Sequence, residues 1–88
     1  MEVTYKPKFL KDLAKIPTPI RKNIELFVFD HLIKMSQIAE SGDIEKLKGY
    51  TGYYKVRFGN YRLGLFIKGD QLIVERVLHR KEIYKFFP

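Results

Sequence analysis

The chain has no cysteine, so disulfide bonds and thiolate metal ligands are excluded. No apolar run approaches the roughly 20 residues that a transmembrane helix needs, and the first residues lack the pattern of a signal peptide. The glycine patterns of nucleotide-binding loops are missing, as are internal repeats and clusters of carboxylates and histidines with metal-ligand character. We therefore expect a cytoplasmic protein that needs no cofactor, no metal ion and no membrane.

Acidic residues are the scarce charge: 10 Asp and Glu stand against 17 Lys and Arg, which gives a net charge of +7. Such an excess predicts a polyanionic partner, either a nucleic acid or an acidic protein. With 88 residues and 45% hydrophobic content, the chain is large enough for one modest core. We expect a single globular domain over residues 1–88.

Two short turn signals, Gly59-Asn60 and Gly69-Asp70, separate three runs of residues that favour strands. Glycine and asparagine tolerate the positive φ that two-residue hairpin turns require. The pattern predicts a three-stranded antiparallel meander with strands over residues 52–58, 61–68 and 71–79.

The first turn sets a register in which Arg57 lies opposite Arg62, and side chains alternate between the two faces of the sheet. The face that we assign to the core carries Tyr54, Val56, Phe58, Leu63, Leu65 and Ile67. The other face, here called the basic face, carries Tyr53, Lys55, Arg57, Arg62 and Phe66. Like charges on neighbouring strands destabilise a sheet. The basic face therefore predicts an anionic ligand, and the alternative is a solvated surface.

The rest of the chain predicts an α+β fold in which a two-helix hairpin packs on a small, mainly antiparallel sheet. The first strand and the two helices are expected over residues 2–6, 8–16 and 19–39. Thr18 is the expected N-cap of the longer helix, and Ser41, Gly42 and Asp43 are expected to form its C-cap and the following loop. The apolar stripe of this helix includes His31, which we interpret as a packed, hydrogen-bonded residue.

The third strand of the meander is less regular. Simple pairing across its turn would place Arg76 opposite Leu63 on the core face, so Arg76 either lies at the sheet margin or follows a β-bulge. In the simple pairing, Glu75 would lie opposite Gly64, near Lys55, and partly neutralise the basic face. The tail over residues 80–87 is expected to be short and helical or irregular, with its aromatic residues packed on the sheet.

Three segments carry a resemblance to a known family: KLKG at residues 46–49, YYKVRFGNYRLGL at 53–65 and HRKEIY at 79–84. Together with the order strand, helix, helix, three strands and tail, they resemble the RelE/ParE superfamily of type II toxins. The resemblance implies a partner antitoxin and, as one assembly, a toxin–antitoxin heterotetramer. It leaves two activities open, since some members cleave mRNA in the ribosomal A site and others inhibit DNA gyrase. A catalytically inactive relative that only binds an antitoxin is a third alternative.

The resemblance also implies a set of catalytic residues, carried over position by position: Lys55, Arg57, Arg62, Arg80 and Tyr84. Tyr84 follows the arginine at a shorter spacing than in one well-known branch of the family, and His79 precedes that arginine as in many relatives. These residues suit metal-independent RNA cleavage, in which the 2′-hydroxyl attacks the adjacent phosphate.

Arg62 is the best candidate for stabilising the transition state, because a guanidinium donates paired hydrogen bonds to phosphate and stays charged. Arg57 and Arg80 would clamp the RNA backbone or stabilise the leaving group. Lys55 is an acid/base candidate, since neighbouring cations favour a neutral amine. Either Tyr84 or His79 would supply the second proton transfer.

Four further residues are candidates for binding RNA or the ribosome. Lys46 and Lys48 lie beside the meander and would contact phosphates, or they are ordinary solvated lysines. Tyr53 and Phe66 are expected opposite each other on the basic face, where they would stack on bases. The alternative is a small apolar patch covered by the tail or by a partner protein.

Overall fold

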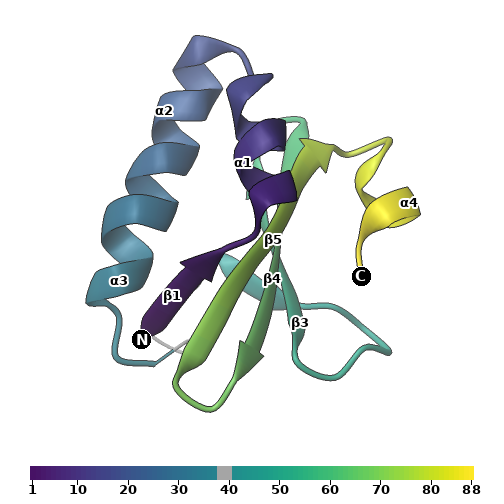
Figure 1. Ribbon diagram of the computed structural model, residues 1–88. Coiled ribbons are helices and arrows are strands. Elements are labelled where there is room, and N and C mark those ends of the chain that lie inside the picture. Colours follow the sequence, from purple (N-terminus) through teal and green to yellow (C-terminus); the bar gives the residue numbers. More distant parts are fainter. Residues whose placement is uncertain (38–40) are drawn as a thin grey trace.

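The computed structural model describes residues 1–37 and 41–88 and has the α+β fold that the sequence predicts (Figure 1). Its strands are β1 (Glu2–Tyr5), β2 (Ile44–Lys46), β3 (Tyr53–Phe58), β4 (Tyr61–Lys68) and β5 (Gln71–His79). Its helical segments are α1 (Pro7–Ala14), α2 (Thr18–Leu26), η1 (Phe27–His31), α3 (Leu32–Lys34) and α4 (Ile83–Phe86).

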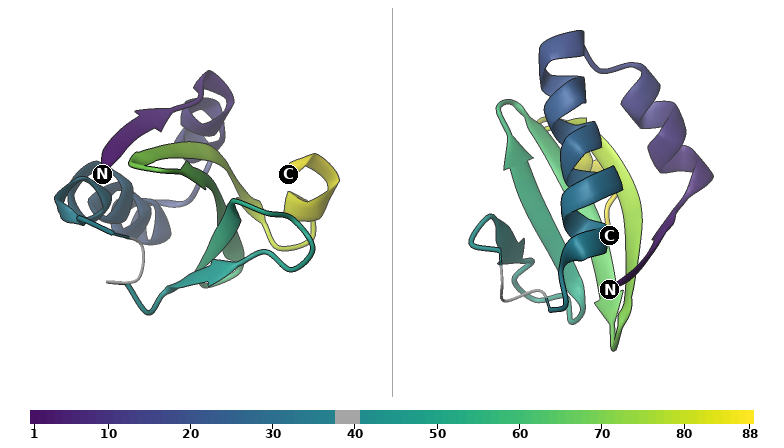
Figure 2. Two further views of the ribbon diagram at one scale, coloured as in Figure 1. Left: turned by 90° about the horizontal axis from the view of Figure 1, so that it is seen from below. Right: turned by 90° about the vertical axis from the view of Figure 1, so that its left-hand side faces the viewer.

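The five strands form one sheet in the order β1-β5-β4-β3-β2. β1 runs parallel to β5 and the other neighbours are antiparallel, so the sheet is mainly antiparallel, as expected. The helical hairpin of α1 and α2 covers one face, and α4 lies on the opposite side (Figure 2). The core between the hairpin and the sheet consists of Phe9, Leu13, Ile16, Ile24, Phe27, Val28, Leu32, Val56, Leu63, Leu65, Leu72, Val74 and Val77.

The meander has the predicted register, with Arg57 opposite Arg62 and Val56 opposite Leu63. Its three strands match the predicted ranges except that β3 begins at Tyr53, one residue later than expected. The short strand β2 was not predicted. It pairs with β3 through Ile44 opposite Val56 and extends the sheet by one strand beyond the meander.

A β-bulge in β5 resolves the position of Arg76. Leu65 pairs with Val74 but Gly64 pairs with Arg76, so Glu75 is the extra residue, and Leu63 lies opposite Val77. Arg76 is thereby moved off the core face, as the bulge alternative predicted. The expectation that Glu75 neutralises the basic face is wrong, because its carboxylate forms an ion pair with Lys6 at 2.9 Å.

The long helix differs from its prediction at both ends. Pro17, not Thr18, occupies the N-cap position, and Thr18 is already helical. The helix runs to Lys34 and Met35 is extended, so the predicted end at Ala39 is wrong, and residues 41–43 lie too far along the chain to cap it. Ile38 and Ala39 themselves lie outside the described residues.

A single π-helical turn, η1, changes which residues face the core. Phe27 and Val28 are buried, but the next buried residue is Leu32, while His31 is exposed. A π turn has one residue more than an α turn, which rotates the following side chains around the helix axis. The interpretation of His31 as a packed core residue is therefore wrong, and Leu32 takes its place.

Candidate functional site

The basic face of the sheet is partly covered by its own small apolar cluster. Leu47 of the β2–β3 loop, Ile83 of α4 and Phe87 form this cluster, with Tyr53 and Leu78 against it. The ring of Phe87 lies directly over Gly64, where an added Cβ would come within 2.7 Å of it. The tail thus packs back on the sheet, as predicted, and holds α4 over β4 and β5.

This packing brings Tyr84 to Lys55. Lys55 Nζ lies 3.2 Å from Tyr84 Oη, in hydrogen-bonding position, and 5.8 Å from the centre of the ring. Lys55 comes from the middle of β3 and is half-buried, whereas Tyr84 comes from α4 and is 55% exposed. The short spacing between Arg80 and Tyr84 therefore still places the phenol on the basic face.

An open cleft of about 350 Å³ surrounds this pair, here called the Lys55–Tyr84 cleft. It is lined by Leu47, Lys48, Tyr50, Lys55, Tyr84, Phe87 and Pro88. Lys48 and Tyr50 come from the β2–β3 loop, so the cleft has one wall from that loop and one from α4. Two lysines and two tyrosines therefore line a space large enough for part of a nucleotide chain.

The arginines lie at the β3–β4 turn. Arg62 donates from Nη1 to the carbonyl oxygens of Gly59 and Tyr61, at 2.8 and 3.0 Å, which fixes its guanidinium beside the turn. The amide of Arg80 donates to the carbonyl of Asn60 at 2.7 Å, so the end of β5 is tied to the same turn.

Four cations of the predicted site thus lie on the basic face or beside the β3–β4 turn: Lys55, Arg57, Arg62 and Arg80. Across residues 1–37 and 41–88, no carboxylate forms an ion pair with any of them. Glu45 lies opposite Lys55 across the β2–β3 pairing but forms no ion pair with it. A cluster of cations whose charges are not held in ion pairs is a ready site for phosphate groups.

His79 is not brought into this cluster. It pairs with Tyr61 on the face that packs toward the helices, with ring centres 5.6 Å apart. Its Nδ1 accepts a hydrogen bond from the amide of Lys81 at 3.2 Å. Of the two alternatives for the second proton transfer, Tyr84 is therefore the one that lies next to Lys55.

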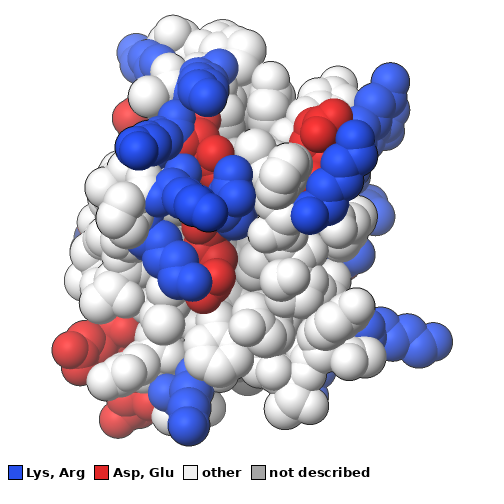
Figure 3. All heavy atoms as spheres, turned by 45° about the vertical axis from the view of Figure 1, so that its right-hand side comes forward, with Lys and Arg blue, Asp and Glu red and all other residues white. Residues whose placement is uncertain are grey.

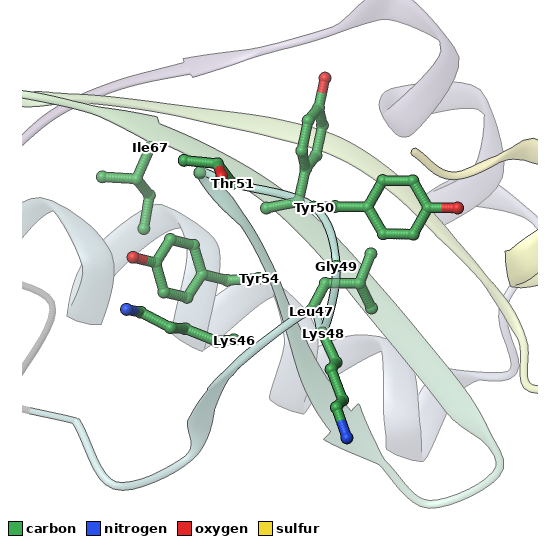
Figure 4. A pocket seen from close by; sticks show the side chains of 10 residues that line it. Lys46, Leu47, Lys48, Gly49, Tyr50, Thr51, Tyr54 and Ile67 are labelled. Carbon is green, nitrogen blue, oxygen red and sulfur yellow. The ribbon is translucent and has the colours of Figure 1, made fainter.

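The four candidates for nucleic-acid binding are separated by the fold. Lys48 lines the Lys55–Tyr84 cleft, whereas Lys46 pairs with Tyr54 and lies toward the other face. Both lysines line a second hollow of about 710 Å³, where Figure 4 shows Lys46 beside Tyr54 with Lys48 pointing away.

Tyr53 and Phe66 face each other with ring centres 4.8 Å apart, and Tyr53 also meets Phe87 at 5.6 Å. Both side chains are half-buried. This arrangement is the patch covered by the tail that was the alternative to base stacking.

Tyr50 lines the cleft but is not among the site residues predicted from the sequence. It is 55% exposed and lines both hollows beside the β2–β3 loop. A single aromatic residue in a loop has no periodic partner, so only its position directly after the KLKG segment could have singled it out.

Two negative observations concern the described part of the chain. No group of three or more His, Asp or Glu side chains there could hold a metal ion. None of the described helices has the length and apolar character needed to cross a lipid bilayer.

Comparison with known proteins identifies the family. Residues 3–84 match the family model described as the ParE toxin of the type II toxin–antitoxin system parDE. Toxin RelE3 of Methanocaldococcus jannaschii is 46% identical over all 88 residues, which span its whole length.

Solved structures agree. The RelB–RelE antitoxin–toxin complex from Methanococcus jannaschii includes a chain with 43% identity and a TM-score of 0.78, over 96% of this chain and 98% of that one. The RelBE2 complex from Mycobacterium tuberculosis gives 26% identity and a TM-score of 0.69, over 90% and 96%. With its sheet, its basic face and these similarities, the chain belongs to the RelE/ParE family of toxins from type II toxin–antitoxin systems.

Proposed function

We propose that this toxin is a ribosome-dependent endoribonuclease that cleaves mRNA in the A site and so inhibits translation. The observation that carries the proposal is the basic face. Four cations that form no ion pair with any carboxylate of residues 1–37 and 41–88 lie on or beside one face of the sheet, and one of them contacts an exposed phenol. The similarity to proteins named RelE toxins supports the same activity.

The reaction needs two proton transfers and one site for negative charge. The 2′-oxygen loses its proton and bonds to the adjacent phosphorus, the bond from phosphorus to the 5′-oxygen breaks, and that oxygen gains a proton. The products are a 2′,3′-cyclic phosphate, or the 3′-phosphate formed from it, and a 5′-hydroxyl. Lys55 and Tyr84 are the two groups for the proton transfers, and their contact distance of 3.2 Å suits them to act on one phosphate.

Arg62 stabilises the extra negative charge on the phosphate in the transition state. Two backbone carbonyls orient its guanidinium before substrate binds, so less conformational freedom is lost in the transition state. Arg57, directly opposite on β3, and Arg80, beside the same turn, hold the flanking phosphates.

The loop residues around the Lys55–Tyr84 cleft complete the RNA site. Lys48 contacts a phosphate and Tyr50 stacks on a base, since both line the cleft. Tyr53 and Phe66 form the apolar floor under α4. Lys46 faces the second hollow and makes a peripheral contact with the ribosome.

The second part of the proposal is a cognate antitoxin. The solved relatives include complexes named RelB–RelE and RelBE2, and a net charge of +7 favours a partner with acidic surface. In the cytoplasm such a partner would cover the basic face and keep mRNA away from it, with a heterotetramer as one form of the complex.

Primer extension on an mRNA in a purified translation system tests the proposed activity. The wild-type protein should produce cuts inside translated codons, and Arg62→Ala should abolish them. Arg21→Ala is the matched control, because Arg21 lies on α2 and contacts Thr18 on the other side of the sheet. Cuts that survive in Arg62→Ala would contradict the assigned role, and intact mRNA with the wild type would contradict the activity.

Inhibition of DNA gyrase is the second candidate, because the matching family model is that of the ParE toxin. A supercoiling assay with the same three proteins separates the two. Inhibition of supercoiling together with intact mRNA would establish the second candidate and refute the first.

A further inference from the structure

A second cluster of basic side chains lies outside the proposed cleavage site, in a groove between α1 and α4. The groove measures about 350 Å³ and is lined by Lys8, Lys11, Asp12, Lys15, Arg76 and Phe86. Figure 3 shows Lys and Arg side chains gathered over α1 around a narrow band of acidic ones.

The three lysines of the groove share one face of α1. Lys8, Lys11 and Lys15 are spaced by three and then four residues, so their side chains follow one another along the helix and its C-terminal end. All three are exposed, and among the residues that the structure describes none has a carboxylate partner. Like charges at this spacing destabilise a helix slightly, so the arrangement favours a role in binding.

Asp12, the acidic residue in the lining, does not neutralise the charge of these three lysines. Asp12 is only 8% exposed and is used entirely within the fold. It accepts hydrogen bonds from Arg76 at 2.8 and 3.1 Å and from the amide of Val77 at 3.2 Å. The outer part of the groove therefore presents positive charge.

An exposed aromatic ring completes the groove. Phe86 is 56% exposed, and the guanidinium of Arg76 lies 5.3 Å from its centre. On the same short helix, the centre of the Tyr84 ring lies 5.8 Å from Lys55 Nζ. α4 thus stands between two clefts, and each cleft has a cation beside an exposed ring. Cations for phosphates together with rings for bases are typical of sites for single-stranded nucleic acid.

We propose that the α1–α4 groove is a second RNA-binding site, which holds the phosphate backbone of RNA that continues past α4 from the cleavage cleft. The inference rests on the proposed function, because it assumes that RNA occupies that cleft. An RNA ligand is favoured over an acidic protein because, among the described residues that line the groove, Phe86 is the one with an apolar side chain. Protein interfaces have an apolar centre, whereas three exposed lysines suit phosphates.

The test compares two triple variants with equal net charge. Lys8→Gln/Lys11→Gln/Lys15→Gln removes the charges of the groove, and Lys22→Gln/Lys34→Gln/Lys68→Gln removes three exposed charges from other elements. Binding to a fluorescent 20-nucleotide single-stranded RNA, and to ribosomes programmed with mRNA, is measured over a range of salt concentrations. Single-turnover cleavage is measured at saturating protein.

We expect the groove variant to bind both probes at least tenfold more weakly than the control at low salt. The slope of log affinity against log salt should fall by about two, since each lost phosphate contact removes roughly 0.7 to 0.9. The cleavage rate at saturation should stay within twofold of wild type, because the groove residues lie outside the cleavage cleft. Equal slopes for the two variants would overturn the proposal.

Two further outcomes separate this inference from the proposed function. If the wild type cuts no RNA but the groove variant still loses its salt slope, the binding site stands and the cleavage proposal fails. If RNA binding is unchanged while a poly-glutamate peptide is bound less tightly by the groove variant alone, the groove serves an acidic protein and the proposal is wrong.

Discussion

Asp12 links α1 to β5 through its carboxylate. β1 covers only the first half of β5, through residues 71–74, so the amides beyond them need another acceptor. The carboxylate of Asp12 supplies it for Val77 and also binds Arg76 through two nitrogens. This hydrogen bonding raises the pKa of Arg76 and keeps its charge fixed.

Replacing Asp12 by alanine should be costly. Arg76, whose side chain is only 17% exposed, and the buried amide of Val77 would both lose their acceptor. We expect a loss of about 3 kcal/mol in the free energy of unfolding, because breaking a buried ion pair leaves one charge uncompensated. Urea denaturation measures it, with Asp43→Ala at an exposed loop position as the control. A loss within the control's range would show that the pair contributes nothing net.

At the scale of elements, the π turn decides how the long helix meets the sheet. In a regular α-helix, the apolar stripe through Phe27 and Val28 could continue to either His31 or Leu32, because each lies four residues after one of them. With the π turn, Leu32 is fully buried and His31 is exposed.

This register predicts that alanine substitutions at the neighbouring positions 31 and 32 have very different effects on the free energy of unfolding. Leu32→Ala should cost about 2–5 kcal/mol in the free energy of unfolding, since it leaves a cavity in the core. His31→Ala should cost less than about 0.5 kcal/mol, as is usual for surface positions. Thermal or urea unfolding of the two variants decides the matter, and similar losses at both positions would contradict the π-helical register.

α4 is a short element, and the ring of Phe87 directly after it lies in close contact with Gly64. Four helical residues are far too few to be stable alone. The helix is held over the basic face by the burial of Ile83 and Phe87.

Gly64→Ala should therefore loosen α4. The added methyl group would overlap the ring of Phe87, and we expect a cost of about 1–3 kcal/mol, with faster amide exchange at Ile83 and Tyr84. In a Phe87→Ala background the same change should cost less than about 0.5 kcal/mol, because the ring is gone. An equal cost in both backgrounds would place the strain elsewhere.

The sequence predicts the meander well because its determinants are local. Gly59-Asn60 and Gly69-Asp70 fix two turns, and the alternation of side chains then assigns Lys55, Arg57 and Arg62 to one face. A likeness in three short segments extends this to the family and to Arg80 and Tyr84.

What the sequence does not predict depends on contacts between distant residues. Asp12 and Arg76 meet across 64 positions in the chain. Tyr84 reaches Lys55 because Ile83 and Phe87 pack the tail against the sheet. The early end of the helix at Lys34 and the strand β2 have no strong local signal, since the pattern of apolar residues continues through Met35.

In the whole molecule, two clefts with basic linings lie on either side of α4. One is the basic face with the Lys55–Tyr84 cleft, and the other is the α1–α4 groove. The helical hairpin covers the opposite face of the sheet and supplies the core (Figure 2). The core thus lies on one side of the sheet and the Lys55–Tyr84 cleft on the other, while α1 of the hairpin also lines the α1–α4 groove.

In the proposed mechanism, the basic face promotes attack by an RNA 2′-hydroxyl on its own phosphate. The most direct test uses programmed ribosomes carrying an mRNA that lacks a single 2′-hydroxyl, on the sugar immediately 5′ of the scissile phosphate. We predict that cleavage at that bond is lost, while an mRNA with the same change one codon upstream is cut normally. Cleavage of the first mRNA at the wild-type rate would contradict the mechanism, because the nucleophile would then have to come from elsewhere.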